Sequence, residues 1–165
     1  MKKALIFLSA AVLCFVLVGC GSSESKQDDS PKEMTKEEIV DKLYSINNDL
    51  TELWNKVICE VSWYTSNGTS LVGEPLDIDF VVSHAKEYYD KVIKNKEFVD
   101  NLPDEYNNLI DAYDKAVDKA TIIYNEIMKE TPVANSIPTY KNDISLFQQY
   151  QNYFYEKVTE MYFNY

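Results

Sequence analysis

Arginine is absent from the 165-residue sequence, and all 16 basic residues are lysine. Without a planar guanidinium, no side chain can grip a phosphate or carboxylate through two parallel hydrogen bonds. The 27 aspartate and glutamate residues outnumber the lysines and give a formal net charge of −11. Because phosphate contacts dominate nucleic-acid affinity, this excess of negative charge excludes nucleic acid as the expected partner.

Glycine and histidine are also scarce. Four glycines are too few for a glycine-rich phosphate-binding loop or a fold built on many tight turns. The single histidine, His84, cannot supply the Glu-x-x-His pairs of a di-iron bundle or the ligands of a zinc site. A haem would have His84 and one axial ligand of another type. We therefore expect no cofactor and no metal.

The beginning of the sequence has the pattern of an export signal. Two lysines follow Met1, and an apolar run of about fifteen residues occupies 4–18. A membrane-spanning helix needs about 20 apolar residues, whereas a secretory signal peptide has a shorter run after a basic start. The sequence therefore predicts an exported protein.

Leu17, Val18, Gly19 and Cys20 resemble the lipobox of bacterial lipoproteins of the Gram-positive type, and small polar residues follow them. The resemblance covers the targeting segment only. It implies that signal peptidase II cleaves before Cys20 and that Cys20 carries a diacylglycerol. The chain would then be held through this lipid at the extracytoplasmic face of the cell membrane.

These motifs divide the chain into three parts. We expect a signal peptide over 1–19, the lipidated cysteine with a flexible polar tether over 20–34, and a folded domain over 35–165. Residues 20–165 keep 14 lysines against 27 acids, a net charge of −13. An anionic bilayer repels such a chain, so the anchoring is expected to come from the acyl chains. Cys59 is the one cysteine in the expected domain, which excludes a disulfide within it.

Proline and glycine mark the limits of the expected helices. They fall at 67–76, 101–104 and 131–139, and the stretches between these breaks are about 23 to 31 residues long. Such lengths suit helices far better than strands. Apolar residues recur at spacings of three and four in each stretch. We therefore expect an all-α fold, with four antiparallel helices in up-down-up-down order.

Local signals refine this expectation. Thr35 and Glu38 form a potential capping box for a first helix that runs through Tyr64. Asp77 or Asp79 would cap the second helix, and Pro103 would lie in the first turn of the third. The expected core faces consist of Ile39, Leu43, Ile46, Leu50, Leu53, Val57, Val61 and Tyr64; Val81, Val82, Ala85, Tyr88, Tyr89, Val92 and Val99; Tyr106, Leu109, Ile110, Tyr113, Ala116, Val117, Ala120, Tyr124, Ile127 and Met128; and Tyr140, Ile144, Phe147, Phe154, Val158 and Met161.

Catalytic motifs are weak in this sequence. Cys59 and His84 are the one Cys/His pair of the expected domain, they come from different expected helices, and no local motif supports a nucleophile. Asp77 and Asp79 lack the spacing of an EF-hand loop and are better explained as helix caps. A small hydrolase or metal-dependent enzyme that uses His84 and nearby carboxylates stays as an alternative function.

An unusual pair of residues lies on the outer face of the first expected helix. Cys59 and Trp63 are four residues apart, on the side opposite the core, where an amphipathic helix normally carries charge. In one interpretation the loop 67–76 folds over them through its apolar residues. In the other, Cys59, Trp63, Leu71 and Val72 form a partner-binding patch, and Tyr153 and Phe163 on the fourth helix form a second such surface.

The function expected from these observations is a membrane-anchored, extracytoplasmic lipoprotein whose helical domain binds a protein or ligand without catalysis. Besides the enzyme named above, two alternatives remain. One is a substrate-binding lipoprotein, although this class usually has two lobes and a longer chain. The other is a lipoprotein that blocks phage DNA entry or plasmid transfer, which only the size and the expected location support.

Overall fold

The computed structural model describes residues 34–163 of the chain. The predicted signal peptide, the lipobox with Cys20, and the predicted tether up to residue 33 lie outside the described residues. Within 34–163 every regular element is a helix, and no strand occurs. The predicted all-α fold class is confirmed. In this same range, no helix combines the length and the apolar character that a membrane crossing requires.

Four long helical segments make up the described domain. In chain order, its elements are α1 (Lys36–Leu53), a π-helical turn (Trp54–Ile58), α2 (Cys59–Asn67), α3 (Ile78–Lys94), α4 (Lys96–Asp100), a 3-10 turn (Asp104–Tyr106), α5 (Asn107–Lys129) and α6 (Lys141–Phe163). The segment from α1 to α2 is continuous, because the π-helical turn joins its two parts.

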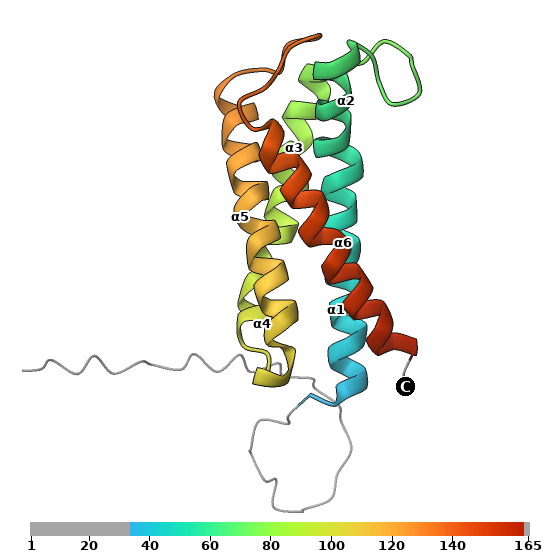
Figure 1. Ribbon diagram of the computed structural model, residues 1–165, viewed down its shortest axis with the longest axis vertical. Helices are drawn as coiled ribbons and strands as arrows, with labels where there is room; N and C mark the ends of the chain where they lie inside the picture. Colours follow the sequence, from blue (N-terminus) through green and yellow to red (C-terminus); the bar gives the residue numbers. More distant parts are fainter. Residues whose placement is uncertain (1–33, 164–165) are drawn as a thin grey trace, which may run out of the picture. The chain divides into compact units, whose positions relative to one another are not determined.

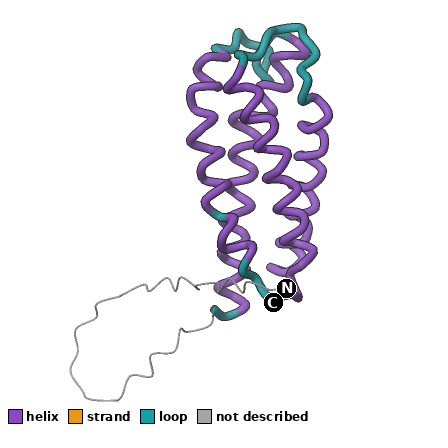
Figure 2. The backbone as a smooth tube through the Cα atoms, turned by 90° about the vertical axis from the view of Figure 1, so that its left-hand side faces the viewer, coloured by secondary structure: helices purple, strands orange, loops and turns teal. Residues whose placement is uncertain are grey.

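These segments lie side by side and enclose one core. α1 packs against α3 and α6, and α5 packs against the same two helices. The loops 68–76 and 131–139 lie at one end of the bundle, which we call the loop end (Figures 1 and 2). At the other end, which we call the N-terminal end, α1 begins and α6 finishes (Figure 1). α6 contacts α5 and α1, and it crosses the bundle obliquely between them.

The helix ends follow the local signals with two corrections. Thr35 and Glu38 form the predicted capping box, and the Asp77 carboxylate accepts a hydrogen bond from the Phe80 N–H as the cap of α3. The second expected helix does not run unbroken through Val99, because Asn95 interrupts it between α3 and α4. Pro103 precedes a 3-10 turn instead of lying in the first turn of α5.

The core consists mainly of the predicted apolar faces, but the prediction that Met128 is buried is wrong. Its side chain is 48% exposed, because it follows Ile127 and lies roughly 100° further around the helix. Several predicted core residues are only half-buried, among them Tyr64, Val82, Tyr88, Tyr89, Ile110, Tyr124 and Met161. The buried residues that the pattern missed are Val40, Asn47, Ile58, Thr65, Ser70, Ile78, Asn95, Leu102, Ala112, Ile123 and Gln151.

The π-helical turn changes which residues of the first segment face the core. The Cys59 N–H donates to the Trp54 carbonyl, five residues back, so this turn holds one residue more than an α-helical turn. Val57 and Ile58 are both 1% exposed as a result. Cys59, expected on the outer face, is half-buried. One turn later Thr65 is buried in place of Tyr64, while Val61 stays buried and Trp63 exposed, as the periodicity predicts.

Polar contacts fix the helices against one another. The Tyr113 hydroxyl on α5 donates to the Val92 carbonyl on α3 at 2.5 Å. Asn95 donates to the Asp49 carboxylate at 2.7 Å and so ties the end of α3 to α1. Charge pairs connect α1 with α3 and α5 with α6, and of these Lys119–Asp143 at 2.9 Å is mostly shielded from water.

Candidate functional site

The two residues with nucleophile or base chemistry have surroundings that suit a structural role. His84 is exposed on α3, and its Nδ1 lies 2.9 Å from the Phe80 carbonyl and 3.0 Å from the Ser83 hydroxyl, both on its own helix. Burial raises the pKa of the Cys59 thiol, and the charge of Glu60 raises it further. A raised pKa keeps this thiol protonated and unreactive at neutral pH. Within residues 34–163 no group of three or more His, Cys, Asp or Glu residues is placed to hold a metal ion.

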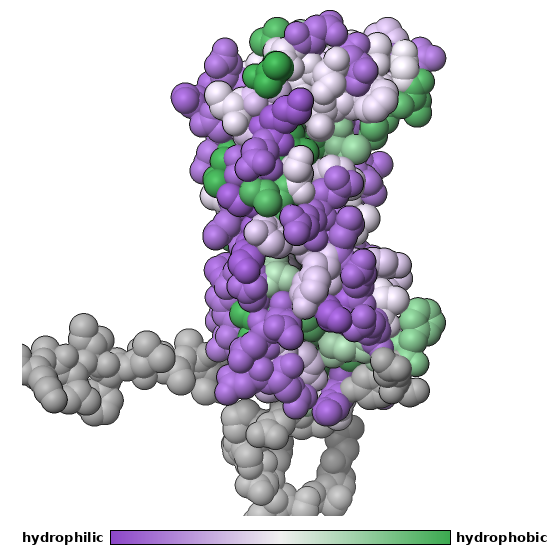
Figure 3. Space-filling view, in the orientation of Figure 1, coloured by the Kyte–Doolittle hydropathy of each residue, from purple (hydrophilic) through white to green (hydrophobic). Residues whose placement is uncertain are grey.

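The loop end instead presents apolar side chains to solvent. Figure 3 shows hydrophobic surface over both loops there. We call the following six exposed residues the loop-end surface: Trp63 on α2, Leu71 and Val72 in loop 68–76, Phe80 in the first turn of α3, and Val133 and Ile137 in loop 131–139. Isolated exposed apolar residues are common on soluble proteins, but gatherings of them at one place mark contact sites.

Loop 68–76 holds its apolar tip in a fixed turn. Ser70 is buried; its N–H donates to the Glu74 carbonyl at 2.8 Å, and its hydroxyl accepts from the Glu74 N–H at 3.1 Å. The Gly73 N–H donates to the Ser70 carbonyl at 2.9 Å, and Gly73 has a φ of 83°, which favours glycine. Leu71 and Val72 lie between these anchoring residues and are 40% and 83% exposed.

This turn is also fastened to α2. The Leu71 N–H donates to the Glu60 carboxylate at 3.2 Å. Trp63 nevertheless keeps 41% of its surface exposed. Loop 68–76 therefore leaves much of the indole accessible, in contrast to the interpretation in which the loop folds over it. Trp63, Leu71 and Val72 are all accessible at one end of the bundle, whereas Cys59 contributes little surface there.

Loop 131–139 lies against the end of α2. The Ser136 N–H donates to the Thr65 carbonyl at 2.7 Å. Gly68 ends α2 with a φ of 75°, and a Cβ there would come within 3.0 Å of the Asn135 amide nitrogen. The two loops therefore meet at the same helix end. This contact brings Val133 and Ile137, which are 61% and 82% exposed, to the loop end.

Tyr153 and Phe163 do not form the single second surface that the sequence suggested. Tyr153 is 39% exposed in a groove that it shares with Asn108 and Asp111 of α5. Phe163 is 79% exposed at the end of α6, in a different groove with Tyr155. Ten residues of helix separate them by about 15 Å.

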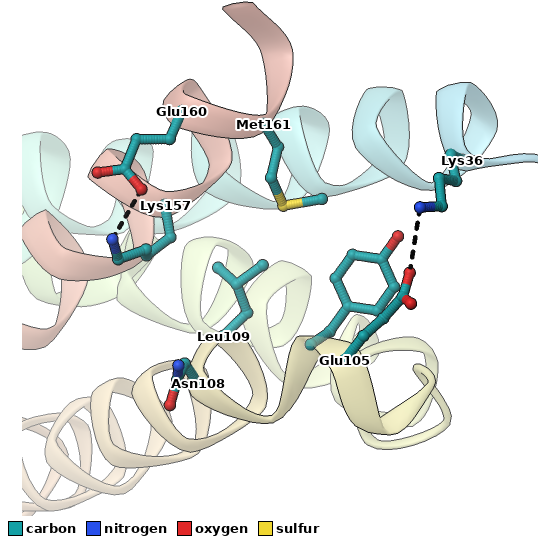
Figure 4. Close-up of a pocket in the computed structure, with 8 residues that line it drawn as sticks. Lys36, Glu105, Asn108, Leu109, Lys157, Glu160 and Met161 are labelled. Atoms are coloured by element: carbon teal, nitrogen blue, oxygen red, sulfur yellow. Dashed lines mark hydrogen bonds and ion pairs between the residues drawn. The ribbon is translucent and has the colours of Figure 1, made fainter. Parts of the chain in front are cut away.

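A larger groove of about 500 Å³ lies between α5 and α6 at the N-terminal end. Figure 4 shows Leu109 and Met161 facing each other across it. Ion pairs flank this apolar part, Lys36–Glu105 at 3.7 Å and Lys157–Glu160 at 2.7 Å. Each ammonium group already has a carboxylate partner, so an anionic ligand would have to displace one. The groove has the character of a helix junction rather than of a charged ligand site.

Comparisons with protein-family models, curated proteins and solved structures find no match to this chain.

Sequence reasoning missed three members of the loop-end surface: Phe80, Val133 and Ile137. Phe80 could have been found, because it follows the Asp77 cap and lies off the stripe that Val81 and Ala85 begin. Val133 and Ile137 gave no periodic signal, since they occur in a loop between prolines. Their position became clear only from the hydrogen bond between Ser136 and Thr65.

Proposed function

We propose that this protein is a lipid-anchored, extracytoplasmic lipoprotein whose helical domain binds a protein partner through the loop-end surface, without catalysis. The observation that carries the proposal is the set of exposed apolar side chains at one end of the bundle, two of which lie on a hydrogen-bonded turn. A surface that is ordered before binding loses little conformational entropy on binding. The lipobox resemblance supports the anchor.

The arrangement that we propose for the domain is an up-down-up-down antiparallel bundle. Its support is the pairing of consecutive long segments, since α1 contacts α3, α3 contacts α5, and α5 contacts α6. Short connections between packed helices favour antiparallel neighbours. In this arrangement the loop end lies opposite the end at which the chain from the proposed anchor enters the bundle (Figure 1).

Charge indicates what kind of surface the partner presents. Residues 60–79 contain Glu60, Glu74, Asp77 and Asp79 and no lysine. Complementary charge steers encounter and disfavours wrong partners more than it adds affinity. The matching surface of the partner is therefore apolar at its centre and lysine- or arginine-rich at its rim.

Trp63→Ala is expected to weaken partner capture without unfolding the domain. Because the indole is 41% exposed, the free energy of unfolding should fall by less than the roughly 3–5 kcal/mol that removal of a fully buried aromatic ring costs. A central aromatic contact contributes about 2 kcal/mol or more to binding, so capture should fall by at least about tenfold. Capture is measured in intact cells as the yield of the covalent adduct formed by a photo-crosslinking amino acid at Val72.

The matched control for this experiment is Tyr153→Ala. Tyr153 is 39% exposed, close to the value for Trp63, but it lies away from the loop end. We expect this variant to give the same adduct yield as the parent chain. An adduct whose yield Trp63→Ala leaves unchanged, or no adduct from position 72 at all, would contradict the binding proposal.

Cys20→Ala tests the anchor. The variant should remain uncleaved by signal peptidase II and should incorporate no labelled fatty acid, because the thioether to diacylglycerol cannot form. The measurement is the mass of the chain together with its label. Cys59→Ala is the control and should be cleaved and labelled like the parent chain. Labelled fatty acid at the N-terminus of Cys20→Ala would show that the proposed lipid attachment at Cys20 is wrong.

A further inference from the structure

A second exposed cluster, distinct from the loop-end surface, lies where α6 ends beside α1. The rings of Tyr44 and Tyr162 are 5.8 Å apart, and Phe163 meets Tyr162 edge-on at 5.8 Å. Tyr155 lies on the same stripe of α6, because seven or eight residues return a helix to the same face. These four residues, which we call the aromatic edge, are 46%, 52%, 79% and 49% exposed in the order named. Of the seven exposed aromatic residues within 34–163, four are in this cluster.

The composition of the aromatic edge suits the interface between lipid and water. Tyrosine has an apolar ring and a polar hydroxyl, and aromatic residues concentrate at the headgroup level of membranes. The aromatic edge itself contains no charge. Glu156 and Glu160 line the groove beside Tyr155 and Phe163, and Lys157 already pairs with Glu160. Attraction between lysines and anionic headgroups would therefore not hold this surface to a membrane, whereas burial of its aromatic rings among the lipids would.

The place of the aromatic edge in the bundle also supports contact with the membrane. Cys20 lies fourteen residues before Met34, so even a fully extended backbone holds the start of the bundle within about 50 Å of the membrane. Tyr44 is eight residues into the first helix, about 12 Å from its start. Asn67, at the loop end, is about 46 Å from that start. Of the two exposed surfaces, the aromatic edge is the one close to the point where the chain from the anchor enters the bundle.

We propose that the aromatic edge rests on the bilayer, with Phe163 inserted at the level between headgroups and acyl chains. The proposal depends on the lipid anchor of the proposed function, which keeps the bundle at high local concentration beside the membrane. Two acyl chains supply the attachment, and the aromatic edge supplies the orientation. The loop-end surface then points away from the membrane, toward the space where a partner is met.

The test uses the full-length lipidated chain in phosphatidylcholine vesicles, with and without bromine on the acyl chains, because bromine quenches tryptophan only at close range. Phe163→Trp and Phe80→Trp report from the two surfaces by the same substitution, and the parent chain gives the contribution of Trp54 and Trp63. We expect bromine to reduce the added emission of Phe163→Trp by about twofold or more. The added emission of Phe80→Trp, at the loop end, should not change.

The outcomes separate the inference from the proposed function. If the chain floats with the vesicles but Phe163→Trp is no more quenched than Phe80→Trp, the aromatic edge does not contact lipid and the inference is wrong, while the anchor stands. If the emission of Phe163→Trp shifts to the blue, is not quenched by bromine and loses this shift when the protein is diluted in the vesicles, a second copy of the chain covers the aromatic edge. This result would also overturn the inference. A full-length chain that does not float would refute the anchor and, with it, this orientation.

Salt provides an independent readout. With residues 20–165 carrying a net charge of −13, anionic lipid repels the bundle, and salt screens this repulsion. In vesicles that contain phosphatidylglycerol, the quenching of Phe163→Trp should therefore increase as the ionic strength rises. A decrease would mean that lysines hold the bundle to the headgroups, which would overturn docking by the aromatic edge.

Discussion

Phe147→Ala is expected to lower the free energy of unfolding by about 3–5 kcal/mol, the range for removal of a fully buried aromatic ring. Phe147 lies in α6 and is 0% exposed, and its ring stacks on Trp54 of the π-helical turn with centroids 6.1 Å apart. The substitution leaves a cavity where α6 meets the first helical segment. Urea denaturation followed by circular dichroism measures the loss.

Phe80→Ala is the matched control for this variant. It removes the same side chain from a position that is 60% exposed, so stability should change by about 1 kcal/mol or less. Equal losses from the two variants would mean that α6 does not contribute the core that the structure assigns to it.

Tyr113→Phe is expected to lower the stability of the domain at neutral pH and to raise it at alkaline pH. At neutral pH the variant should be less stable by about 1 kcal/mol, because it loses the hydrogen bond from the Tyr113 hydroxyl to the Val92 carbonyl. Above about pH 11 it should be more stable than the parent chain. Urea denaturation at a series of pH values between neutral and about pH 11.5 measures the crossing.

The sign follows from which state ionises first. Burial raises the pKa of Tyr113 well above its ordinary value of 10, and the carboxylates of Asp49, Asp100 and Asp114 raise it further. The unfolded chain loses this proton above about pH 10, while the folded chain keeps it. The stabilisation that comes from the protonated Tyr113 phenol is therefore fully present below about pH 10. It falls by about 1.4 kcal/mol per pH unit as the pH rises toward the folded-state pKa of this phenol. Phenylalanine has no proton to lose and escapes this decline.

Other ionisable groups also lower the stability of the domain at alkaline pH, and the parent chain and Tyr113→Phe share them. Burial, with a smaller effect of Glu126, raises the pKa of Tyr140 to about 12, so its contribution is lost between about pH 10 and 12. Ile123→Val is the control, because it lowers stability by about 1 kcal/mol and keeps every phenol. Its curve should run parallel to that of the parent chain. A parallel curve for Tyr113→Phe would show that this phenol is accessible to water in the folded state.

The sequence alone determined the fold class and most of the core. Proline and glycine cannot continue a helix, so their positions separated the long helical segments. Apolar spacing of three and four residues then identified the buried faces, and Thr35 with Glu38 identified the first helix end from local hydrogen bonding alone. These features depend on residues a few positions apart in the chain, which is why a single sequence contains them.

The tertiary structure decided what local spacing leaves open. Periodicity assumes 3.6 residues in every turn, so it missed the π-helical turn that buries Ile58 and half-buries Cys59. Asn47 is 2% exposed with its amide oxygen unpaired, because the neighbouring helices cover it. Polar character would have placed that residue in solvent.

The same reason applies to the two exposed surfaces. Tyr44 and Tyr162 are 118 positions apart in the sequence and meet only because α6 crosses to α1. Whether Trp63 was covered depended on how loop 68–76 is held; Ser70 and Glu60 fix this loop, and the indole stays 41% exposed. Exposure of an apolar side chain is a property of its distant neighbours, and those are set by packing.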